Sequence, residues 1–373
     1  MKKIKIAFLG FGNIGCGVYR ILNDMKNEIK TRDGLDIEIA KILVRDLNKA
    51  RNADIEMSLL TTNASEIIED PSISIVIESM GGEEPARSYI LSSLKSGKKV
   101  VTANKEVVSK HWDELRQAAE ENNTGLYYEA SVAGGIPIIK VLEESLQANR
   151  ISEMMGIING TTNFILTKMY EEGRNFDDVL KEAQTAGYAE PDPTSDIEAF
   201  DPVFKLSILS SIAFHQRVEI KKIYREGITN IKKDDIDYGN ELGYVLKLLA
   251  IGKMNGNSLE ARVHPTFLSK SHPLASVRDS YNAVFIKGDS VGNLMLYGRG
   301  AGDLPTGSAV VSDIINASRS SHGKKPSLIK NTQEQSSITF NNNWESQFFI
   351  RLTVKDKPGV LANIAGILGK HNV

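Results

Sequence analysis

A glycine-rich turn near the N-terminus constrains the fold of this chain more than any other feature. A short apolar stretch leads into the pattern G-x-G-x-x-G at residues 10–15, and apolar residues recur at helical spacing over residues 18–29. Gly10 permits the tight turn, Gly12 lets the backbone approach a phosphate, and Gly15 lets the helix pack close to the strand. The helix start offers free N–H groups and a partial positive charge. The turn therefore predicts a dinucleotide-binding site, with a plain strand–helix turn as the alternative.

The end of the second predicted strand, residues 37–44, decides which nicotinamide cofactor fits. A carboxylate at this point binds the ribose 2′-hydroxyl of NAD, whereas an arginine accommodates the 2′-phosphate of NADP. Arg45 is the first residue after this strand and favours NADP, with a solvated surface charge as the alternative interpretation. Asp46 follows it and leaves NAD as a possible cofactor. The residues predicted to hold the cofactor here are Gly10, Gly12, Asn13, Ile14, Gly15 and Arg45.

Strands and helices alternate over the first third of the chain. Further strands are predicted at residues 74–78, 99–102 and 125–129, with helical segments between them. Parallel strands need such crossover helices, which cover both faces of the sheet. We therefore expect an α/β fold that opens with a Rossmann-type NAD(P)-binding domain at residues 1–135.

The pattern then changes. Helices are predicted at residues 137–148, 204–214 and 309–317, strands become less regular, and residues 241–254 carry apolar side chains at helical spacing. This mixture predicts an α+β catalytic and dimerisation domain at residues 136–320.

A polar stretch predicts a linker at residues 321–345, and a third region follows at residues 346–373. Its pattern predicts a strand at 348–354, a Pro-Gly turn, and an amphipathic helix at 360–368. One strand and one helix are too little for an independent domain.

The composition limits the function further. Of 373 residues, 41% are apolar and 25% are charged, which is typical of a globular protein and excludes a wholly disordered chain. The 45 Lys and Arg residues balance the 47 Asp and Glu residues, so no bulk positive charge indicates a nucleic-acid partner. Cys16 is the single cysteine, which rules out an internal disulfide framework. Because no apolar run is long enough for a membrane span, we expect a cytoplasmic enzyme with no membrane partner.

Five motifs in one order carry a resemblance to a known family. They lie at residues 10–15, 100–105 (V-V-T-A-N-K), 159–164 (N-G-T-T-N-F), 187–193 (G-Y-A-E-P-D-P) and 298–302 (G-R-G-A-G). Together they resemble homoserine dehydrogenase. The resemblance implies the NAD(P)H-dependent, reversible reduction of L-aspartate 4-semialdehyde to L-homoserine, in threonine, isoleucine and methionine biosynthesis, by a homodimer or homotetramer.

Lys205 is the candidate acid for this chemistry. Hydride delivered to an aldehyde carbon leaves charge on the oxygen, and a positioned acid must neutralise it. Asp201-Pro202 is typical of an N-cap and first helical position, so Lys205 is expected in the first turn on the same face as Leu209 and Ile212. Burial and the helix dipole both disfavour its charge there. The resemblance makes Lys205 the proton donor; a lysine that merely pairs with Asp201 is the alternative.

A second lysine and several acids complete the candidate site. Lys105 follows a strand at its C-terminal end, where open α/β sheets bind ligands, and the resemblance places it beside the nicotinamide and the reacting oxygen. The substrate's ammonium group needs carboxylates, which the segment before Lys205 supplies. The predicted substrate residues are Glu190, Asp201, Asp196, Gly160 and Thr161, with a turn role as the alternative for Asp196. The family usually has glycine where this chain has Ala199, which puts the loop geometry in question.

The resemblance also implies a monovalent cation, sodium, and a late cofactor contact. Backbone carbonyl groups in the segment after the last predicted parallel strand suit a hard, weakly bound ion; a glycine-rich hinge is the alternative. The implied cation ligands are Glu129, Val132, Gly134 and Ile136, and Gly302 is expected to close over the cofactor. The six histidines are scattered, so no transition-metal site is predicted.

The segment at residues 352–361 resembles the opening of an ACT domain, a small ligand-binding regulatory module. Residues 346–373 therefore predict a partial ACT-like regulatory segment, with a coincidental strand–turn–helix as the alternative. In the family this module is linked to feedback by threonine. We expect weak or no threonine inhibition of this chain, because half of the module is missing from the sequence.

Two other classes of protein stay open at this point. A different NAD(P) oxidoreductase would keep the glycine turn without needing the acids before Lys205. An amino-acid-sensing protein whose nucleotide-binding fold no longer supports catalysis would need neither Lys105 nor Lys205. The two lysines favour the enzyme.

Overall fold

The computed structural model describes residues 2–49, 54–320 and 338–372. These residues divide into two compact units, Met1–Asn342 and Asn343–Val373. Most of the predicted linker at 321–345 lies outside the described residues. Across the described chain, no helix combines the length and the apolar character that crossing a membrane requires.

The larger unit begins with a six-stranded parallel sheet in the order β3-β2-β1-β4-β5-β6. This order reverses between β1 and β4, and such a reversal opens a ligand-binding crevice at the carboxyl ends of the strands. The predicted Rossmann-type fold is confirmed. The strands are β1 (Lys2–Leu9), β2 (Leu35–Leu43), β3 (Leu60–Thr61), β4 (Ile75–Glu78), β5 (Lys99–Thr102) and β6 (Leu126–Tyr127).

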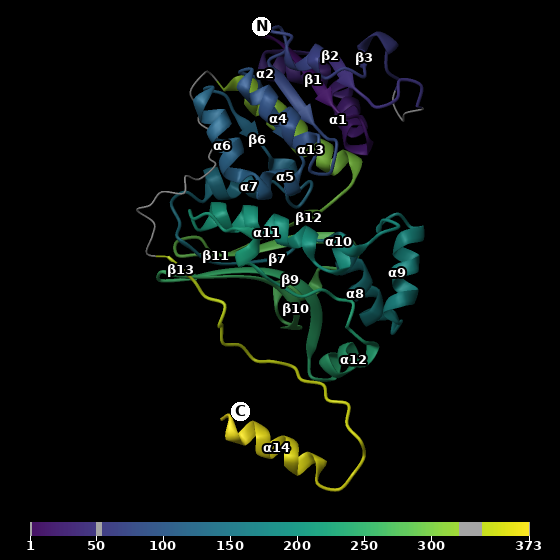
Figure 1. Ribbon diagram of the computed structural model, residues 1–373, viewed down its shortest axis with the longest axis vertical. Coiled ribbons are helices and arrows are strands. Elements are labelled where there is room, and N and C mark those ends of the chain that lie inside the picture. The colour runs from purple at the N-terminus through teal and green to yellow at the C-terminus, as the bar shows by residue number, and fades with distance from the viewer. Residues whose placement is uncertain (1, 50–53, 321–337, 373) are drawn as a thin grey trace. The chain divides into compact units, whose positions relative to one another are not determined.

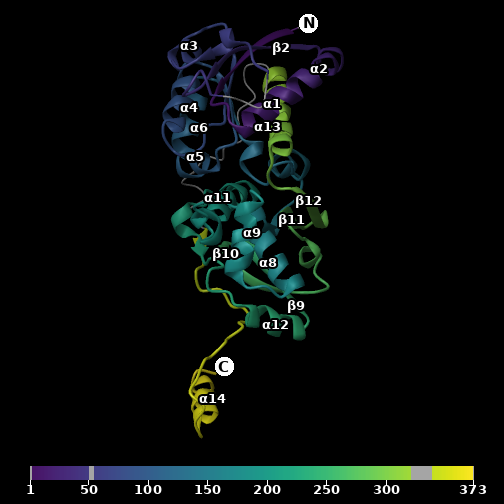
Figure 2. The same ribbon diagram turned by 90° about the vertical axis from the view of Figure 1, so that its right-hand side faces the viewer.

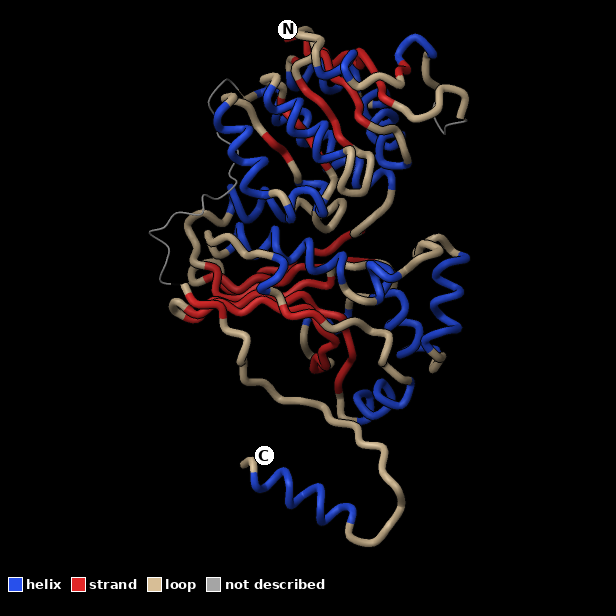
Figure 3. Tube along the Cα trace, viewed as in Figure 1, coloured by secondary structure: helices blue, strands red, loops and turns tan. Residues whose placement is uncertain are grey.

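Helices cover both faces of this sheet (Figure 3). Successive residues of β1 point to opposite faces. Ile6 and Phe8 pack in one apolar cluster, and Ala7 and Leu9 pack in another. The helices are α1 (Asn13–Asp24), α2 (Lys26–Asp33), α3 (Ser65–Ile68), α4 (Ala86–Lys95), α5 (Lys105–Lys110) and α6 (Trp112–Glu121), with a short turn η1 (Met57–Leu59).

A mixed sheet follows, with the strand order β12-β11-β7-β9-β10-β13 and β8 paired to β10. It confirms the expected α+β second half. Its strands are β7 (Ile151–Ile157), β8 (Tyr224–Arg225), β9 (Tyr244–Asn255), β10 (Ser258–Ser269), β11 (Tyr281–Gly288), β12 (Gly292–Arg299) and β13 (Thr339–Phe340). The helical segments are η2 (Glu129–Ser131), α7 (Ile138–Lys140), η3 (Val141–Ser145), α8 (Gly160–Glu172), α9 (Phe176–Thr185), α10 (Thr194–Ile197), α11 (Phe200–Ala213), η4 (Ile220–Lys222), α12 (Lys233–Glu241), η5 (Pro273–Ser276) and α13 (Asp303–Arg319).

Helices α11 and α8 occupy opposite faces of the mixed sheet. Gly252 of β9 packs against Ser210 and Phe214 at the end of α11. Lys247, of opposite parity in β9, reaches Asn163 of α8. Figure 1 shows α11 between the mixed sheet and the parallel-sheet half. The α11 face of this sheet is therefore the one that meets the nucleotide-binding half.

The helical spacing of apolar residues at 241–254 does not mark a helix. Most of the segment is the strand β9, Tyr244–Asn255. Eight of its twelve residues, 245–252, are buried in succession, because α8 and α11 cover both faces. A strand buried on both faces has a continuous apolar run, and such a run satisfies helical spacing as readily as strand spacing.

The smaller unit is described by itself. It holds one helix, α14 (Val360–Lys370), which confirms the helix predicted at 360–368. The strand predicted at 348–354 is wrong, since these residues form no regular structure. A strand needs a partner for its backbone groups, and the described residues of this unit supply none.

The last helix of the larger unit, α13, returns from the mixed sheet to the parallel sheet. Figures 1 and 2 both show it beside α1. Val310 and Ile314 of α13 share an apolar cluster with Phe8 of β1 and Val18 of α1. The chain therefore crosses from one half to the other twice before residue 320, and the division into domains at residues 135 and 320 stays a prediction.

The close approach of α1 and α13 depends on Gly17. A Cβ added to Gly17 would overlap the carbonyl group of Asp303 at the start of α13. We predict that Gly17→Ala lowers the free energy of unfolding by about 1–3 kcal/mol, because the helices must separate to fit the methyl group. Urea denaturation of the full chain measures this.

The matched control is Gly366→Ala in α14, where an added Cβ would meet no described atom within 4 Å. This variant should not be destabilised, since alanine favours a helix more than glycine does. Equal stability of Gly17→Ala and the unaltered protein would contradict the packing argument.

Candidate active site

The glycine turn lies at the carboxyl end of β1 and has the geometry of a phosphate cradle. Gly10 adopts φ +89°, and a Cβ there would lie 2.7 Å from Met80 Cγ. A Cβ on Gly12 would meet no described atom within 4 Å, so the space beside this backbone is open. No described side chain caps the start of α1 at Asn13. The first N–H groups of α1, which include those of Asn13 and Ile14, therefore fit a dinucleotide pyrophosphate.

The other predicted cofactor residues lie around this turn. A Cβ on Gly15 would lie 3.2 Å from Phe11, consistent with close packing of the helix on the strand. Arg45 is exposed two residues after the end of β2, which is the expected position for a ribose contact. Gly302 adopts φ +119° immediately before α13, whose first residue Asp303 contacts α1. The structure thus brings Gly302, distant in sequence, beside the helix that the turn begins.

A buried carboxylate joins the two candidate lysines. The Nζ of Lys205 lies 2.6 Å from Asp201 Oδ2, and the Nζ of Lys105 lies 3.3 Å from Asp201 Oδ1. Lys205 Nζ also donates to the carbonyl of Ile158 at 2.8 Å. Lys205 is 12% exposed and Asp201 6% exposed at the side chain, whereas Lys105 is 41% exposed.

The charges of this cluster stabilise one another. Burial by itself raises the pKa of the Asp201 carboxyl, but Lys205 and Lys105 outweigh it and hold the pKa well below its usual range. Asp201, and more weakly Asp196 and Glu190, raise the pKa of Lys105. The site therefore holds an ionised carboxylate between two ammonium groups.

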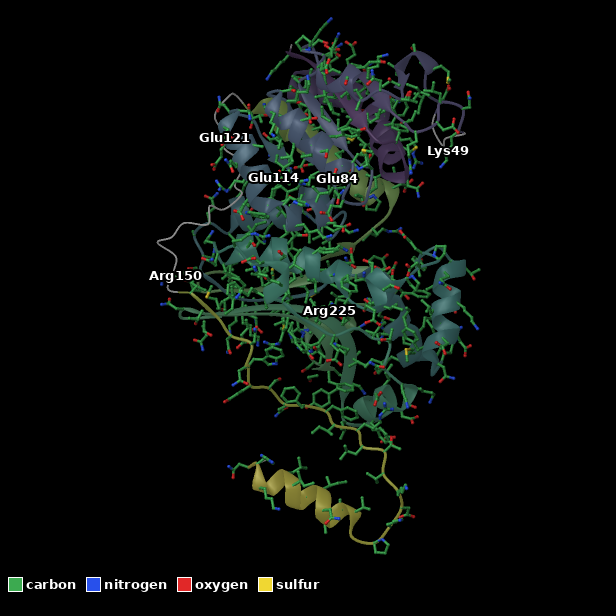
Figure 4. The ribbon with its side chains drawn as sticks, viewed as in Figure 1. Lys49, Glu84, Glu114, Glu121, Arg150 and Arg225 are labelled. Carbon is green, nitrogen blue, oxygen red and sulfur yellow. The ribbon has the colours of Figure 1, made fainter. Side chains whose placement is uncertain are left out.

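Helix α11 positions Asp201 and Lys205 differently from the sequence prediction. Asp201 is not the N-cap; the helix begins at Phe200 after Ala199, which adopts the left-handed conformation with φ +63°. The Asp201 carboxylate bonds to lysine and amide groups instead of capping its own helix. Arg225, labelled in Figure 4, stacks 3.8 Å above the Phe200 ring and helps to fix the turn.

Glycine would adopt the Ala199 conformation without the steric conflict of a Cβ. Ala199 is nevertheless fully buried. Ala199 therefore adopts the same left-handed turn that glycine would allow, and its methyl group is buried in the core.

Asn159 is a site residue that the sequence analysis did not select. Its Nδ2 donates to Asp201 Oδ2 at 2.9 Å and to Asp196 Oδ1 at 2.7 Å. Its Oδ1 accepts from Thr162 N at 2.9 Å and caps α8. Thr161 Oγ1 donates to Asp196 Oδ2 at 3.0 Å. The N-G-T-T-N motif contained the signal, since an asparagine before a helix is a typical N-cap.

The remaining residues predicted to bind the substrate are Glu190, Gly160 and Asp196, and in the described structure none of them forms a hydrogen bond or ion pair with either lysine. Glu190 is exposed, and its charge reaches Lys105 only over a distance. A Cβ on Gly160 would lie 2.9 Å from the Ser280 carbonyl oxygen, so this position requires glycine. Burial, and then the charge of Asp201, raise the pKa of Asp196. The structure brings together five of the predicted residues, with Glu190 at the edge: Lys105, Asp196, Asp201, Lys205 and Thr161.

Glu78 is a second residue that the sequence analysis did not select, and it is connected to the start of α5 at Lys105 through Thr102 and Asn104. Its carboxyl group is fully buried at the end of β4, accepts from Thr102 Oγ1 at 2.5 Å and accepts from Met80 N at 2.7 Å. Burial raises the pKa of Glu78. Thr102 Oγ1 in turn accepts from the N–H of Asn104, which caps α5 ahead of Lys105. In the sequence, hydrophobic periodicity identifies Glu78 only as the last residue of a predicted strand. It gives no indication that the side chain is buried beside the site.

The predicted cation loop lies where the two halves meet. A Cβ on Gly134 would overlap the carbonyl group of Gly300. Among the described residues, the carbonyl oxygens of Glu129 and Ile136 accept backbone N–H groups, whereas those of Val132 and Gly134 accept none. Two such oxygens suit a hard cation. No group of three or more His, Cys, Asp or Glu residues in the described chain could hold a metal ion.

The Glu129 side chain has a structural partner of its own. Its carboxylate accepts from Ile139 N and Lys140 N, each at 2.8 Å, at the start of α7. Its backbone N–H donates to Asp313 Oδ2 of α13 at 2.9 Å. Glu129 thus connects the loop to helices of both halves.

Comparisons with known proteins identify the same two regions. Residues 10–129 match the family model described as "Homoserine dehydrogenase, NAD binding domain", and residues 137–315 match the model "Homoserine dehydrogenase". The homoserine dehydrogenase of Bacillus subtilis is 41% identical over 100% of this chain and 86% of its own length. That of Synechocystis is 42% identical over 99% of this chain and 87% of its own length.

Solved structures agree. A homoserine dehydrogenase from Thiobacillus denitrificans has a TM-score of 0.88 and 42% identity, covering 99% of this chain and 86% of that one. A hyperthermophilic archaeal homoserine dehydrogenase in complex with NADPH has a TM-score of 0.72 and 28% identity, covering 85% of this chain and 98% of that one.

The buried acids Glu129 and Asp313 predict how stability depends on pH. Burial, and then the charge of Asp313, raise the pKa of Glu129 to about 7; burial raises the pKa of Asp313 to about 6. Between about pH 4 and pH 7 the folded protein retains protons that the unfolded chain releases. The contribution of these two acids to the free energy of unfolding therefore falls as the pH rises through this range, on the order of a few kcal/mol.

The measurement is urea denaturation from pH 5 to pH 8. Other groups titrate in the same range, so the pH dependence of the unaltered protein is compared with that of Glu129→Gln and of Asp313→Asn. In each variant the free energy of unfolding should fall less steeply as the pH rises. An unchanged slope in both variants would rule out the pair as its source.

Proposed function

The chain belongs to the homoserine dehydrogenase family of NAD(P)-dependent oxidoreductases, and from this premise we propose which residues carry out the reaction. The observation that carries the proposal is the pair of lysines on one buried carboxylate, with Asp201 Oδ2 2.6 Å from Lys205 and Asp201 Oδ1 3.3 Å from Lys105. Lys105 follows β5 at the carboxyl end of the parallel strands, where this fold binds ligands, and Asp201 and Lys205 reach it from α11.

Lys205 is the proposed proton donor. A reduced nicotinamide, when bound, would supply the hydride that adds to the aldehyde carbon of L-aspartate 4-semialdehyde. The charge that develops on the aldehyde oxygen is neutralised by a proton from Lys205 Nζ, which yields the hydroxyl group of L-homoserine. In the reverse direction neutral Lys205 accepts that proton. Asp201 and the Ile158 carbonyl hold the Lys205 ammonium group in place.

Lys105 has a different proposed role. It is more exposed than Lys205 and keeps its charge beside Asp201. A fixed ammonium group next to the reacting oxygen stabilises the negative charge that develops there. Lys105 therefore orients the aldehyde and contacts the cofactor, while the proton comes from Lys205.

The acids bind the amino-acid end of the substrate. Asp196, Asp201 and Glu190 surround the lysines with negative charge. A substrate ammonium group finds its complement there, and Gly160 and Thr161 line the pocket with backbone groups. Because Glu190 is exposed, it can turn toward the ligand without breaking a buried contact.

For the cofactor we propose NADP over NAD, bound by the glycine turn with Arg45 at the 2′-phosphate and Gly302 over the dinucleotide. For the cation we propose sodium, held by carbonyl oxygens of Glu129, Val132, Gly134 and Ile136, which would brace the junction of the two halves. We further propose a cytoplasmic homodimer or homotetramer in threonine, isoleucine and methionine biosynthesis, with residues 346–373 as an ACT-like regulatory segment.

A steady-state assay tests this function. The protein should oxidise NADPH with L-aspartate 4-semialdehyde, and reduce NADP with L-homoserine, but not with simple 2-hydroxy acids. NADPH should give a higher kcat/KM than NADH, and sodium should raise the activity. Turnover of 2-hydroxy acids without turnover of the semialdehyde would contradict the substrate assignment.

The role of Lys205 gives a sharper prediction. Lys205→Ala should lower kcat by about 10²–10⁴-fold, because the general acid is lost, while NADPH binding measured by fluorescence titration stays unchanged. Lys181→Ala on the exposed face of α9 is the matched control and should keep full activity. Turnover of Lys205→Ala close to that of the unaltered protein would remove Lys205 as the acid.

A further inference from the structure

Lys247 of β9 carries a buried ammonium group that the proposed mechanism does not use. The residue is 2% exposed, and its three hydrogen bonds all go to uncharged oxygen atoms. Burial lowers the pKa of Lys247 to about 8, and the charge of Glu171 offsets only part of this effect. An apolar side chain of similar volume would avoid the cost of burying a cation. The contacts of the ammonium group therefore show what a lysine provides here and an apolar residue could not.

The ammonium group orients the amide of Asn163 in α8. Lys247 Nζ donates to Asn163 Oδ1 at 2.9 Å and to the carbonyl group of Val277. An ammonium group can only donate, so the oxygen of the Asn163 amide must face it. The Nδ2 atom is thereby turned the other way, where it donates to the carbonyl groups of Asp279 at 2.9 Å and Tyr281 at 3.2 Å. Lys247 thus fixes the direction in which this buried amide donates.

Together the two side chains hold the segment 277–281, which leads into β11. Residues 277–280 belong to no helix or strand, so their carbonyl groups have no regular backbone partners. Three carbonyl groups of the segment accept from Lys247 or Asn163 instead. The position of this irregular segment therefore depends on one buried lysine and one buried asparagine.

The segment packs against the start of the helix that carries substrate candidates. A Cβ on Gly160, the first residue of α8, would lie 2.9 Å from the carbonyl oxygen of Ser280. Thr161 follows Gly160 in the helix. Asn159 precedes it and donates to Asp201 Oδ2 at 2.9 Å. A shift of the segment would therefore be felt where α8 approaches the lysine–carboxylate cluster.

We propose that Lys247 is a positioning residue for the substrate and acts through Asn163. It holds the segment 277–281 against the start of α8 and so fixes the backbone groups of Gly160 and Thr161. This proposal rests on the proposed function, because it takes the amino-acid end of the substrate to bind at these groups. That end is remote from the reacting carbon and keeps its contacts in the transition state. Its misplacement should therefore weaken substrate binding and leave the chemical step unchanged.

The test is the steady-state oxidation of L-homoserine by the full chain carrying Lys247→Met, which keeps the length of the side chain and removes its charge. The KM for L-homoserine should rise about 3- to 10-fold, the effect of one hydrogen bond, while kcat and the dissociation constant of NADP stay unchanged. The matched control is Lys253→Met on the same strand, where the lysine is 40% exposed and pairs with Glu153 at 2.8 Å. This control should keep the KM of the unaltered protein.

Other outcomes would overturn the proposal. A lower free energy of unfolding of Lys247→Met with an unchanged KM for L-homoserine would make Lys247 a structural residue only. A fall in kcat without a change in KM would assign it to the chemical step, and weaker binding of NADP alone would assign it to the cofactor.

A second variant keeps the proposal testable if Lys247→Met does not fold. Asn163→Asp keeps an oxygen acceptor for Lys247 and gives it a counter-ion, but removes the N–H donor to the segment 277–281. The KM for L-homoserine should again rise about 3- to 10-fold. An unchanged KM in Asn163→Asp would overturn the proposal.

Hydrogen exchange separates this proposal from the proposed function, because it needs no turnover. In Lys247→Met or Asn163→Asp the backbone N–H groups of residues 278–281 and of the first turn of α8 should exchange faster than in the unaltered protein. In Lys253→Met their exchange should be unchanged. Unchanged exchange in the first two variants would overturn the proposal. Faster exchange in them, with no turnover of L-homoserine by the unaltered protein, would count against the proposed function alone.

Discussion

The carboxylate of Asp201 is the point on which the two halves of the larger unit converge. Lys205 comes from the same helix, whereas Lys105 comes from α5 of the nucleotide-binding half. Burying a carboxylate is unfavourable unless opposite charge and hydrogen bonds replace the lost water. Two ammonium groups and the amide of Asn159 do so here. If one partner is displaced, a charge is left buried without compensation, so the positions of α5, α8 and α11 all depend on this contact.

Close backbone approaches make that convergence possible. Glycine allows it at three places where the halves or their helices touch: Gly17 against Asp303, Gly134 against Gly300, and Gly160 against the Ser280 carbonyl. A side chain at any of them would force neighbouring backbone apart, because packed interiors have little free space. Glycine therefore has two roles in this chain: it forms the turn at residues 10–15, and it allows close packing between elements at these three positions.

Charge is distributed locally although the whole chain is nearly neutral. The formal net charge is −2, yet acids gather around Lys105 and Lys205, whereas Arg45 is exposed two residues after the end of β2. A dinucleotide phosphate and a substrate ammonium group need opposite surroundings. In the proposed binding mode the two groups bind apart, with the phosphate at the start of α1 and the amino-acid end against α8 and α11.

By itself the sequence determined the nucleotide-binding fold and the family, because each is carried by short contiguous segments: a strand–turn–helix pattern around Gly10 for the fold, and five motifs in one order for the family. Only the tertiary structure decided how those segments meet. It made residues 244–255 a strand, since both faces are covered, and it turned Asp201 from a presumed cap into a shared counter-ion. It also brought Asn159 and Glu78 beside the two lysines and Asp201. Local patterns report which residues share a face of one element. They do not report which distant element covers that face, and the role of a buried polar group is set by that neighbour.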